Sequence, residues 1–216
     1  MAGFYSIGHF KGAPIRLHWT FALALFVVLL SSHEYFWLNR VAGALCLILP
    51  YLLLTLVHEL GHAYVAHRRG LQVIALEIYP VHGRCIYQMP HYEMDHVMVA
   101  WAGVTAQAIL LLPALAVSLL LKSLPFELQP YAGSVLSILI TINLVSIVFN
   151  LLPFDGLDGK TAWRIVPIHY ANLKQHWRGM RDRATTKAGE DGISKAKAQE
   201  IADEAIKKIM TKDQTK

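Results

Sequence analysis

Four long apolar runs alternate with shorter polar segments along the chain, at about residues 17–32, 38–66, 97–121 and 132–152. A membrane-spanning helix needs roughly 20 apolar residues. The last three runs meet that length, and the first approaches it between two tryptophans suited to the membrane interface, Trp19 and Trp37. The pattern predicts an α-helical integral membrane protein with about four core transmembrane helices.

Two shorter segments depart from this helical pattern. Residues 71–79 and 84–87 are rich in strand-forming side chains and flank a turn at Pro80 and Gly83, which predicts a small β-hairpin between helices 2 and 3. Residues 1–16 are expected to be irregular. Pro50 is expected to kink or divide the second helix, because proline lacks the N–H that continues the hydrogen-bond ladder.

The chain becomes polar after the fourth run. We expect a membrane domain over residues 1–170 and a soluble basic C-terminal tail over residues 171–216. Within the tail, residues 177–192 are expected to be flexible. Residues 193–210 carry apolar side chains at helical spacing and are expected to form a short amphipathic helix.

The distribution of basic residues predicts how the chain lies in the membrane. The net charge is +5, and 13 of the 20 Lys and Arg residues fall from Lys160 onward. Most of the remaining basic residues flank the runs on the same side in a four-helix arrangement, so the positive-inside bias places both termini and the 67–96 loop in the cytoplasm. No nucleic-acid motif accompanies the basic tail. The lipid bilayer is therefore the expected partner of this charge.

The second apolar run contains the sequence His58-Glu59-Leu60-Gly61-His62. Residues i and i+4 share a face of a helix, so His58 and His62 can bind one zinc ion while Glu59 acts as general base toward water. In a soluble helix such a motif is often only a solvated face. Ionisable groups inside a membrane span are costly and need a partner, which favours a metal site here.

A catalytic zinc ion takes three protein ligands and keeps a position open, so a third ligand must come from elsewhere. Asp158 and Asp155 both follow the fourth run, and each directly precedes a glycine. Asp158 is the leading candidate and Asp155 its rival, but spacing alone leaves both open. Asn150 is a candidate donor to the oxyanion that forms during hydrolysis. A second acidic and histidine-rich segment, His91 to His96, is expected to be a solvated loop before the third helix.

The two motifs together resemble the site-2 proteases, which are intramembrane zinc metalloproteases. The second motif of that family reads Asn-x-x-Pro-x-x-x-x-Asp-Gly, and this chain has Asn150, Pro153, Asp158 and Gly159 at those positions. The resemblance implies that Asp158, rather than Asp155, is the third zinc ligand and that Asn150 is the polar helper. It also implies that the 71–89 strands hold an unwound substrate. Gln107 departs from the small residue or asparagine usual at its position.

The resemblance implies a function as well as a site. We expect an intramembrane zinc endopeptidase with one Zn²⁺ per chain, acting in regulated intramembrane proteolysis. Its expected substrates are the transmembrane segments of single-pass membrane proteins, cut near the cytoplasmic side. The alternative is a non-proteolytic, metal-binding membrane scaffold or transporter. The base at Glu59 argues against it, because metal binding alone does not need a base there.

Overall fold

The computed structural model describes residues 3–31, 40–190, 197, 200 and 203–204. The chain forms two compact units, Met1–Trp163 and Arg164–Lys216. The first unit contains the sheet and the apolar helices, and the second contains α7 (Ile165–Glu190). The division of function between residues 1–170 and a tail over residues 171–216 stays a prediction.

A four-stranded sheet in the order β1-β2-β3-β4 lies in the first unit. Its strands are β1 (Phe4–Phe10), β2 (Ala13–His18), β3 (Val73–Ile78) and β4 (Gly83–Tyr87). The pair β1–β2 and the pair β3–β4 are antiparallel, while β2 and β3 are parallel. The predicted hairpin is confirmed as β3–β4. It is only half of the sheet.

The expectation that residues 1–16 are irregular is wrong. Lys11 and Gly12 have φ angles of 48° and 89°, the left-handed conformation that closes a tight hairpin turn. Ala13 is buried against Ala63 and Leu76, which ties the first hairpin to α2 and β3. Strand β2 pairs with β3, which lies far along the chain, and this pairing orders a segment that the local sequence does not mark as a strand.

In the part of the chain that the structure describes, three helices are long and apolar enough to cross a membrane: Arg40–Arg68, Glu93–Ser123 and Gln129–Asn150. The first is α2 (Arg40–Arg68), and the second joins α3 (Glu93–Ser118) to the 3-10 turn η2 (Leu121–Ser123). The third consists of α4 (Gln129–Ser137), the π-helical segment η3 (Ile138–Ile142) and α5 (Asn143–Asn150). The second, third and fourth predicted spans are thus confirmed at membrane length.

Two details of the predicted helices are corrected. Within the described residues, the first apolar run gives α1 (Thr20–Ser31), a helix of 12 residues that is shorter than a span, and Leu17 and His18 belong to β2 instead. The α2 helix continues through Pro50 without dividing. Prolines inside membrane helices are tolerated where neighbouring groups satisfy the freed backbone.

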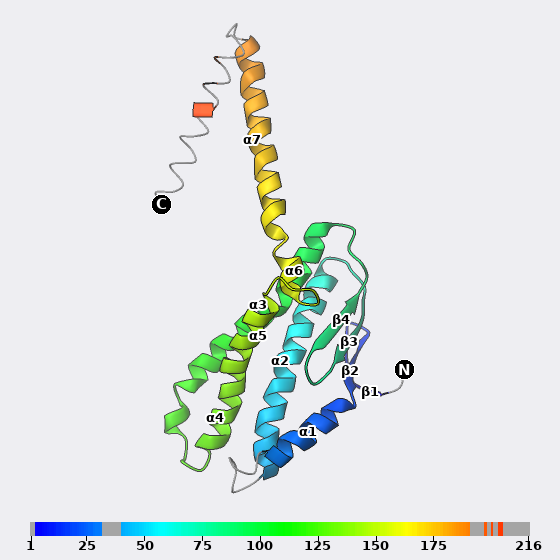
Figure 1. Ribbon diagram of the computed structural model, residues 1–216, viewed down its shortest axis with the longest axis vertical. Helices are drawn as coiled ribbons and strands as arrows, with labels where there is room; N and C mark the ends of the chain where they lie inside the picture. Colours follow the sequence, from blue (N-terminus) through cyan, green and yellow to red (C-terminus); the bar gives the residue numbers. More distant parts are fainter. Residues whose placement is uncertain (1–2, 32–39, 191–196, 198–199, 201–202, 205–216) are drawn as a thin grey trace. The chain divides into compact units, whose positions relative to one another are not determined.

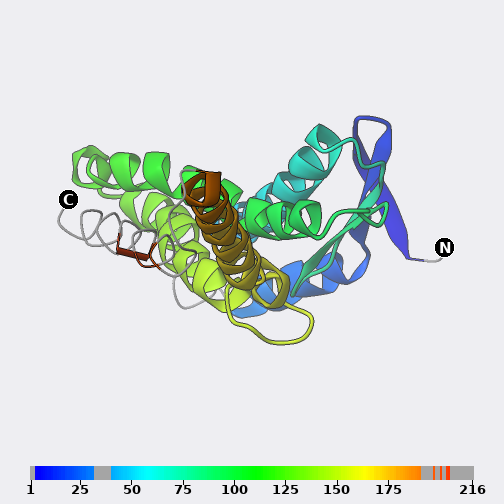
Figure 2. The ribbon, with the colours of Figure 1, turned by 90° about the horizontal axis from the view of Figure 1, so that it is seen from above.

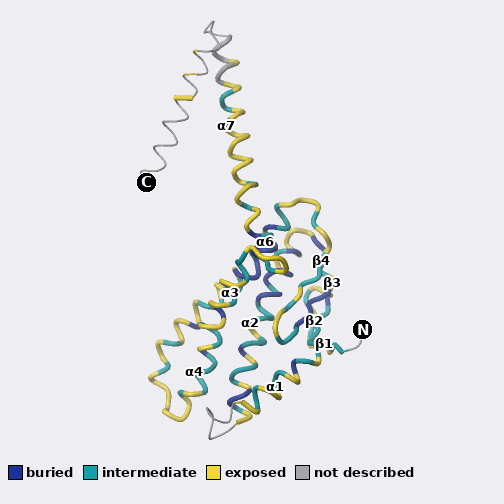
Figure 3. Tube along the Cα trace, viewed as in Figure 1, coloured by how far each residue is buried: buried dark blue, intermediate teal, exposed yellow. Residues whose placement is uncertain are grey.

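The apolar helices keep most of their surface outside the protein core. Only 28%, 17% and 11% of the three membrane-length windows is buried within the protein. Leu49, Ile109 and Val148 are among the exposed apolar side chains, and exposed positions follow α2, α3 and α4 in Figure 3. Such a surface suits the hydrocarbon of a bilayer, where apolar side chains meet no water.

The sheet covers one side of α2, and α4 and α5 lie on its other side, as Figures 1 and 2 show. The contact with the sheet involves the C-terminal half of α2, where Ala63 packs on Leu76 of β3. In the same half, Ala66 packs on Leu71 and on Val99 of α3. The His58–His62 segment is therefore enclosed between strands and helices rather than facing lipid.

Two expectations about polar segments are also wrong. Helix α3 begins at Glu93, so the predicted loop over residues 91–96 is helical in its last four residues. Its first turn is fixed by an ion pair of 3.2 Å between Asp95 and Arg69 and by a hydrogen bond between His96 and Tyr87. In the second unit, α7 is helical to Glu190 and replaces most of the predicted flexible segment 177–192. The amphipathic helix predicted over 193–210 falls largely outside the described residues.

Candidate metal centre

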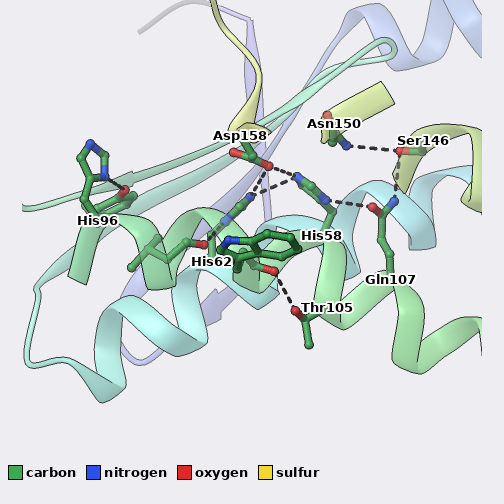
Figure 4. Close-up of polar contacts among 11 residues, drawn as sticks. His58, His62, His96, Thr105, Gln107, Ser146, Asn150 and Asp158 are labelled. Atoms are coloured by element: carbon green, nitrogen blue, oxygen red, sulfur yellow. Dashed lines mark hydrogen bonds and ion pairs between the residues drawn. The ribbon is translucent and has the colours of Figure 1, made fainter. Parts of the chain in front are cut away.

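His58, His62 and Asp158 converge on one point, as Figure 4 shows. The two Nε2 atoms are 3.0 Å apart. Oδ2 of Asp158, the first residue of α6 (Asp158–Ala162), lies 3.0 Å from Nε2 of His58 and 3.1 Å from Nε2 of His62. Among the residues that the structure describes, this is the one group of three or more His, Cys, Asp or Glu side chains close enough to share an ion.

The far side of each imidazole ring determines which nitrogen carries hydrogen. Nδ1 of His62 lies 2.7 Å from the carbonyl oxygen of Val99, and Nδ1 of His58 lies 3.0 Å from Oε1 of Gln107. Both oxygens only accept, so each Nδ1 donates. In the neutral rings, both Nε2 lone pairs then face each other and a carboxylate.

This arrangement favours a cation between the three atoms. Two lone pairs and a carboxylate oxygen at about 3 Å from one another repel unless positive charge lies between them. Ligands of one tetrahedral zinc ion, each at about 2.0–2.2 Å, are roughly 3.3–3.5 Å apart, so a small outward shift of the three atoms accommodates the ion. The cluster therefore fits one zinc ion.

The structure separates the two aspartates that spacing left open. Burial raises the pKa of Asp158, but the two imidazoles beside it, which donate to its carboxylate when they are protonated on Nε2, outweigh burial and hold the pKa well below its usual range. Asp158 is thus an anion facing the imidazoles. The side chain of Asp155 is 88% exposed and pairs with Lys160, so Asp155 lies outside the cluster.

Close packing of backbone against the site depends on two glycines. A Cβ atom on Gly103 would lie 2.5 Å from Nε2 of His62 and 2.6 Å from Cε1 of His58. A Cβ atom on Gly83 would overlap the carboxylate of Glu59. The absence of a side chain at these positions lets α3 and β4 approach the ligands and the acid.

Glu59 lies beside the cluster, 4% exposed. Its carboxylate accepts a hydrogen bond from the backbone N–H of Cys85 on β4. Burial, together with the nearby carboxylates of Glu59 and Asp158, raises the pKa of the Cys85 thiol to about 12, so this thiol is neutral at physiological pH. Strand β4 therefore holds Glu59 through its backbone, and the Cys85 side chain adds no second negative charge.

A cavity of about 510 Å³ joins these groups. The residues that line it include the three clustered side chains, Glu59, Asn150 and the strand β4 from Gly83 to Cys85, and an apolar wall of Tyr51, Leu54 and Phe149. Asn150 ends α5, and its amide donates to Oγ of Ser146 at 3.4 Å. The cavity is large enough to admit a peptide segment beside the cluster.

Two tryptophans fix the segment that carries Asp158. Nε1 of Trp163 donates to the carbonyl of Leu151 at 2.7 Å, and Nε1 of Trp101 donates to the carbonyl of Ala162 at 3.0 Å. The two indoles also meet edge to face. These contacts tie the ends of the 151–162 segment to each other and to α3.

Sequence reasoning did not assign a role to Gln107, Ser146 or Asn143. Gln107 contacts His58 directly and Ser146 through its amide nitrogen, and Asn143 donates to the carbonyl of Gln107. One signal was available: Asn143, Ser146 and Asn150 recur at helical spacing in a run that is otherwise apolar.

Comparison with known proteins identifies relatives of this chain. No protein-family model matches it. It is 31% identical over 176 residues to the zinc metalloprotease MJ0392 of Methanocaldococcus jannaschii, an alignment that covers 79% of this chain and 48% of that protein. The chain thus spans about half the length of this curated relative.

The fold also has a solved counterpart. The structure of the site-2 protease from Methanocaldococcus jannaschii matches with a TM-score of 0.55 over 86% of this chain and 81% of that one. At 23% sequence identity this likeness concerns the fold. The chain is therefore a homologue of this zinc metalloprotease and has a site-2 protease-like fold.

Proposed function

We propose that this chain is an intramembrane zinc endopeptidase. One observation carries the proposal: Nε2 of His58, Nε2 of His62 and Oδ2 of Asp158 converge within 3.1 Å of one another beside the buried Glu59. These groups belong to a chain with membrane-length helices and a zinc metalloprotease relative. A hydrolytic zinc site needs protein ligands, such as two imidazoles and a carboxylate, and a nearby acid that does not bind the metal. These groups are all present here.

Each residue has a distinct task in peptide hydrolysis. His58, His62 and Asp158 hold the zinc ion. When bound, the ion acts as a Lewis acid that polarises the scissile carbonyl and makes water more acidic. Glu59 takes the proton of the attacking water and delivers it to the leaving amine. The Asn150 amide, on the same cavity wall, donates to the developing oxyanion.

The position of β4 suggests how a peptide bond reaches this site. A helix shields its own peptide groups, so a transmembrane substrate must unwind before it is cut. Strand β4 is an edge strand of the sheet, and its residues line the cavity beside Glu59. An extended segment added to that edge would present its backbone to the cluster.

We further propose that the substrates are transmembrane segments of single-pass membrane proteins. The basic residues that flank the helices favour an orientation with both termini and the sheet in the cytoplasm, so cleavage is expected near that side of the membrane. The competing proposal is a metal-binding scaffold or transporter. A scaffold or transporter needs no general base, so it does not account for the buried Glu59 that β4 holds beside the cluster.

The Glu59→Gln variant tests this function. Wild type and variant, each reconstituted with membrane proteins, are compared by mass spectrometry of the fragments released from the bilayer. Loss of the general base should lower cleavage by about 10²- to 10⁴-fold while zinc content stays at the wild-type value. Glu127→Gln, a change at an exposed acid, is the control and should cleave normally. Equal cleavage by Glu59→Gln and wild type would refute the proposal.

A further inference from the structure

A chain of hydrogen bonds inside the apolar helices connects the metal centre to Asn150. Oε1 of Gln107 lies 3.0 Å from Nδ1 of His58. Nε2 of Gln107 donates to Oγ of Ser146 at 3.2 Å, and Nδ2 of Asn150 donates to the same oxygen at 3.4 Å. Figure 4 shows these four side chains in a continuous row. His58 and Asn150, which have proposed roles in hydrolysis, are therefore joined through Gln107 and Ser146, which have none so far.

The backbone supports this row in a specific way. The π-helical segment η3 ends at Ile142, directly before α5. A π-helical turn holds more residues than an α-helical turn, so it changes which side chains face a neighbouring helix, and such turns often occur near functional sites. After it, Asn143, Ser146 and Asn150 lie on one face at helical spacing. The Asn143 side chain, fully buried, donates to the backbone carbonyl of Gln107 at 3.0 Å. The polar face of α5 is thus fixed against α3.

Polar groups inside a membrane span are costly unless they are paired or serve a site. Gln107 is 1% exposed, and both ends of its amide have partners within the site. The orientation of that amide sets the state of His58. When Oε1 of Gln107 faces the His58 ring, Nδ1 of His58 carries the hydrogen. The lone pair of its Nε2 then points toward the place where His62 and Asp158 converge. A reversed amide would favour hydrogen on Nε2 and remove that lone pair.

We propose that Gln107 and Ser146 are positioning residues of the metal centre. Gln107 holds the His58 ring in its ligating tautomer. Ser146 fixes the Gln107 amide by accepting from its nitrogen, and the same oxygen accepts from the amide of Asn150. Ring orientation at His58 and amide orientation at Asn150 are then set by one hydroxyl. This inference rests on the proposed zinc site, but metal binding tests it without any measurement of proteolysis.

The first experiment measures zinc affinity by competition with a chelator, on purified full-length chain in detergent. Gln107→Met keeps the size of the side chain and removes both hydrogen bonds. Outer partners of ligating histidines typically contribute about 10- to 100-fold in metal affinity, and this loss is expected. Gln107→Glu keeps an acceptor for Nδ1 and should restore most of the affinity. Gln129→Met, which removes a partly exposed glutamine whose amide donates to the carbonyl of Leu124, should bind zinc like wild type.

The visible spectrum of the cobalt-substituted protein gives a second readout, because it reports the ligand geometry. Gln107→Met should shift its bands, and Gln107→Glu should return them toward the wild-type positions. Wild-type zinc affinity together with an unchanged cobalt spectrum in Gln107→Met would overturn the proposal. If Gln107 had only a structural role, Gln107→Met would unfold at a lower temperature, and Gln107→Glu would not restore the zinc affinity.

Ser146→Ala keeps the test decisive if Gln107→Met fails to fold. This smaller change should lower zinc affinity severalfold and broaden the cobalt bands. Ser134→Ala, at a partly exposed serine of α4 whose hydroxyl donates to the carbonyl of Pro130, should change neither. Unchanged zinc affinity and spectrum in Ser146→Ala would overturn the role of Ser146. If wild type binds zinc in this way yet cleaves nothing, the protease proposal fails and the positioning proposal stands.

Discussion

The two halves of the metal centre are built by different means. His58 and His62 come from adjacent turns of one helix, and helix geometry alone brings them to the same face. Asp158 comes from a short segment after the last membrane-length helix and reaches the cluster only through the fold. A local motif can thus supply most of a site, while the residue that completes the site depends on distant packing.

The halves also differ in their surroundings. The side chains of His58 and His62 are 10% and 7% exposed, against 26% for Asp158. The histidines are enclosed by Gly103 and by partners on α3, whereas the segment that carries Asp158 is held by hydrogen bonds from two indoles. We therefore expect the histidine half to be rigid and the aspartate half to be the more adjustable one.

The strongest test of the comparison removes the distant half. Asp158→Ala leaves both histidines in place but deletes one of three ligands. It should lower zinc affinity by more than the roughly 10- to 100-fold that an outer partner contributes, as measured by chelator competition. Asp155→Ala removes an exposed carboxylate that pairs with Lys160 and should keep full affinity. The reverse order of the two variants would reassign the ligand.

A smaller effect is expected when the local half is crowded. Gly103→Ala places a methyl group against both imidazoles, and overpacking of this kind costs about 1–3 kcal/mol. Zinc affinity should fall roughly tenfold or more, and the protein should unfold at a lower temperature. Gly133→Ala is the matched control on α4, where the nearest atom, Cδ2 of Leu121, is 3.9 Å from the added carbon. Equal zinc affinity in the two variants would show that α3 does not enclose the histidines this closely.

The smallest effect is expected from loosening the aspartate half. Trp101→Phe removes the hydrogen bond to the carbonyl of Ala162 and keeps most of the ring contact with Trp163. A neutral hydrogen bond contributes about 1 kcal/mol, so zinc affinity should fall roughly fivefold. Trp19→Phe, at a half-exposed indole near the sheet, should bind zinc normally. If Trp101→Phe also binds zinc like wild type, the indole does not position Asp158.

The sequence was most informative where structure is local. His58 and His62 share a helical face through spacing alone, and apolar run length predicted the three membrane-length helices. The strands β1 and β2 were missed because β2 is ordered by pairing with β3, far along the chain. Spacing could not separate Asp158 from Asp155, since the path of the intervening loop decides between them. Gln107 and Ser146 were missed for a similar reason: their partners lie on other helices.

Zinc K-edge X-ray absorption of the purified wild-type chain tests the central claim most directly, because it reports the atoms around the metal. The structure predicts one zinc ion bound through nitrogen and oxygen at about 2.0–2.2 Å, with imidazole scattering from two histidines. Cys85 lines the same cavity but is absent from the cluster among the described residues. A sulfur atom at about 2.3 Å, or a site without histidine, would contradict the account.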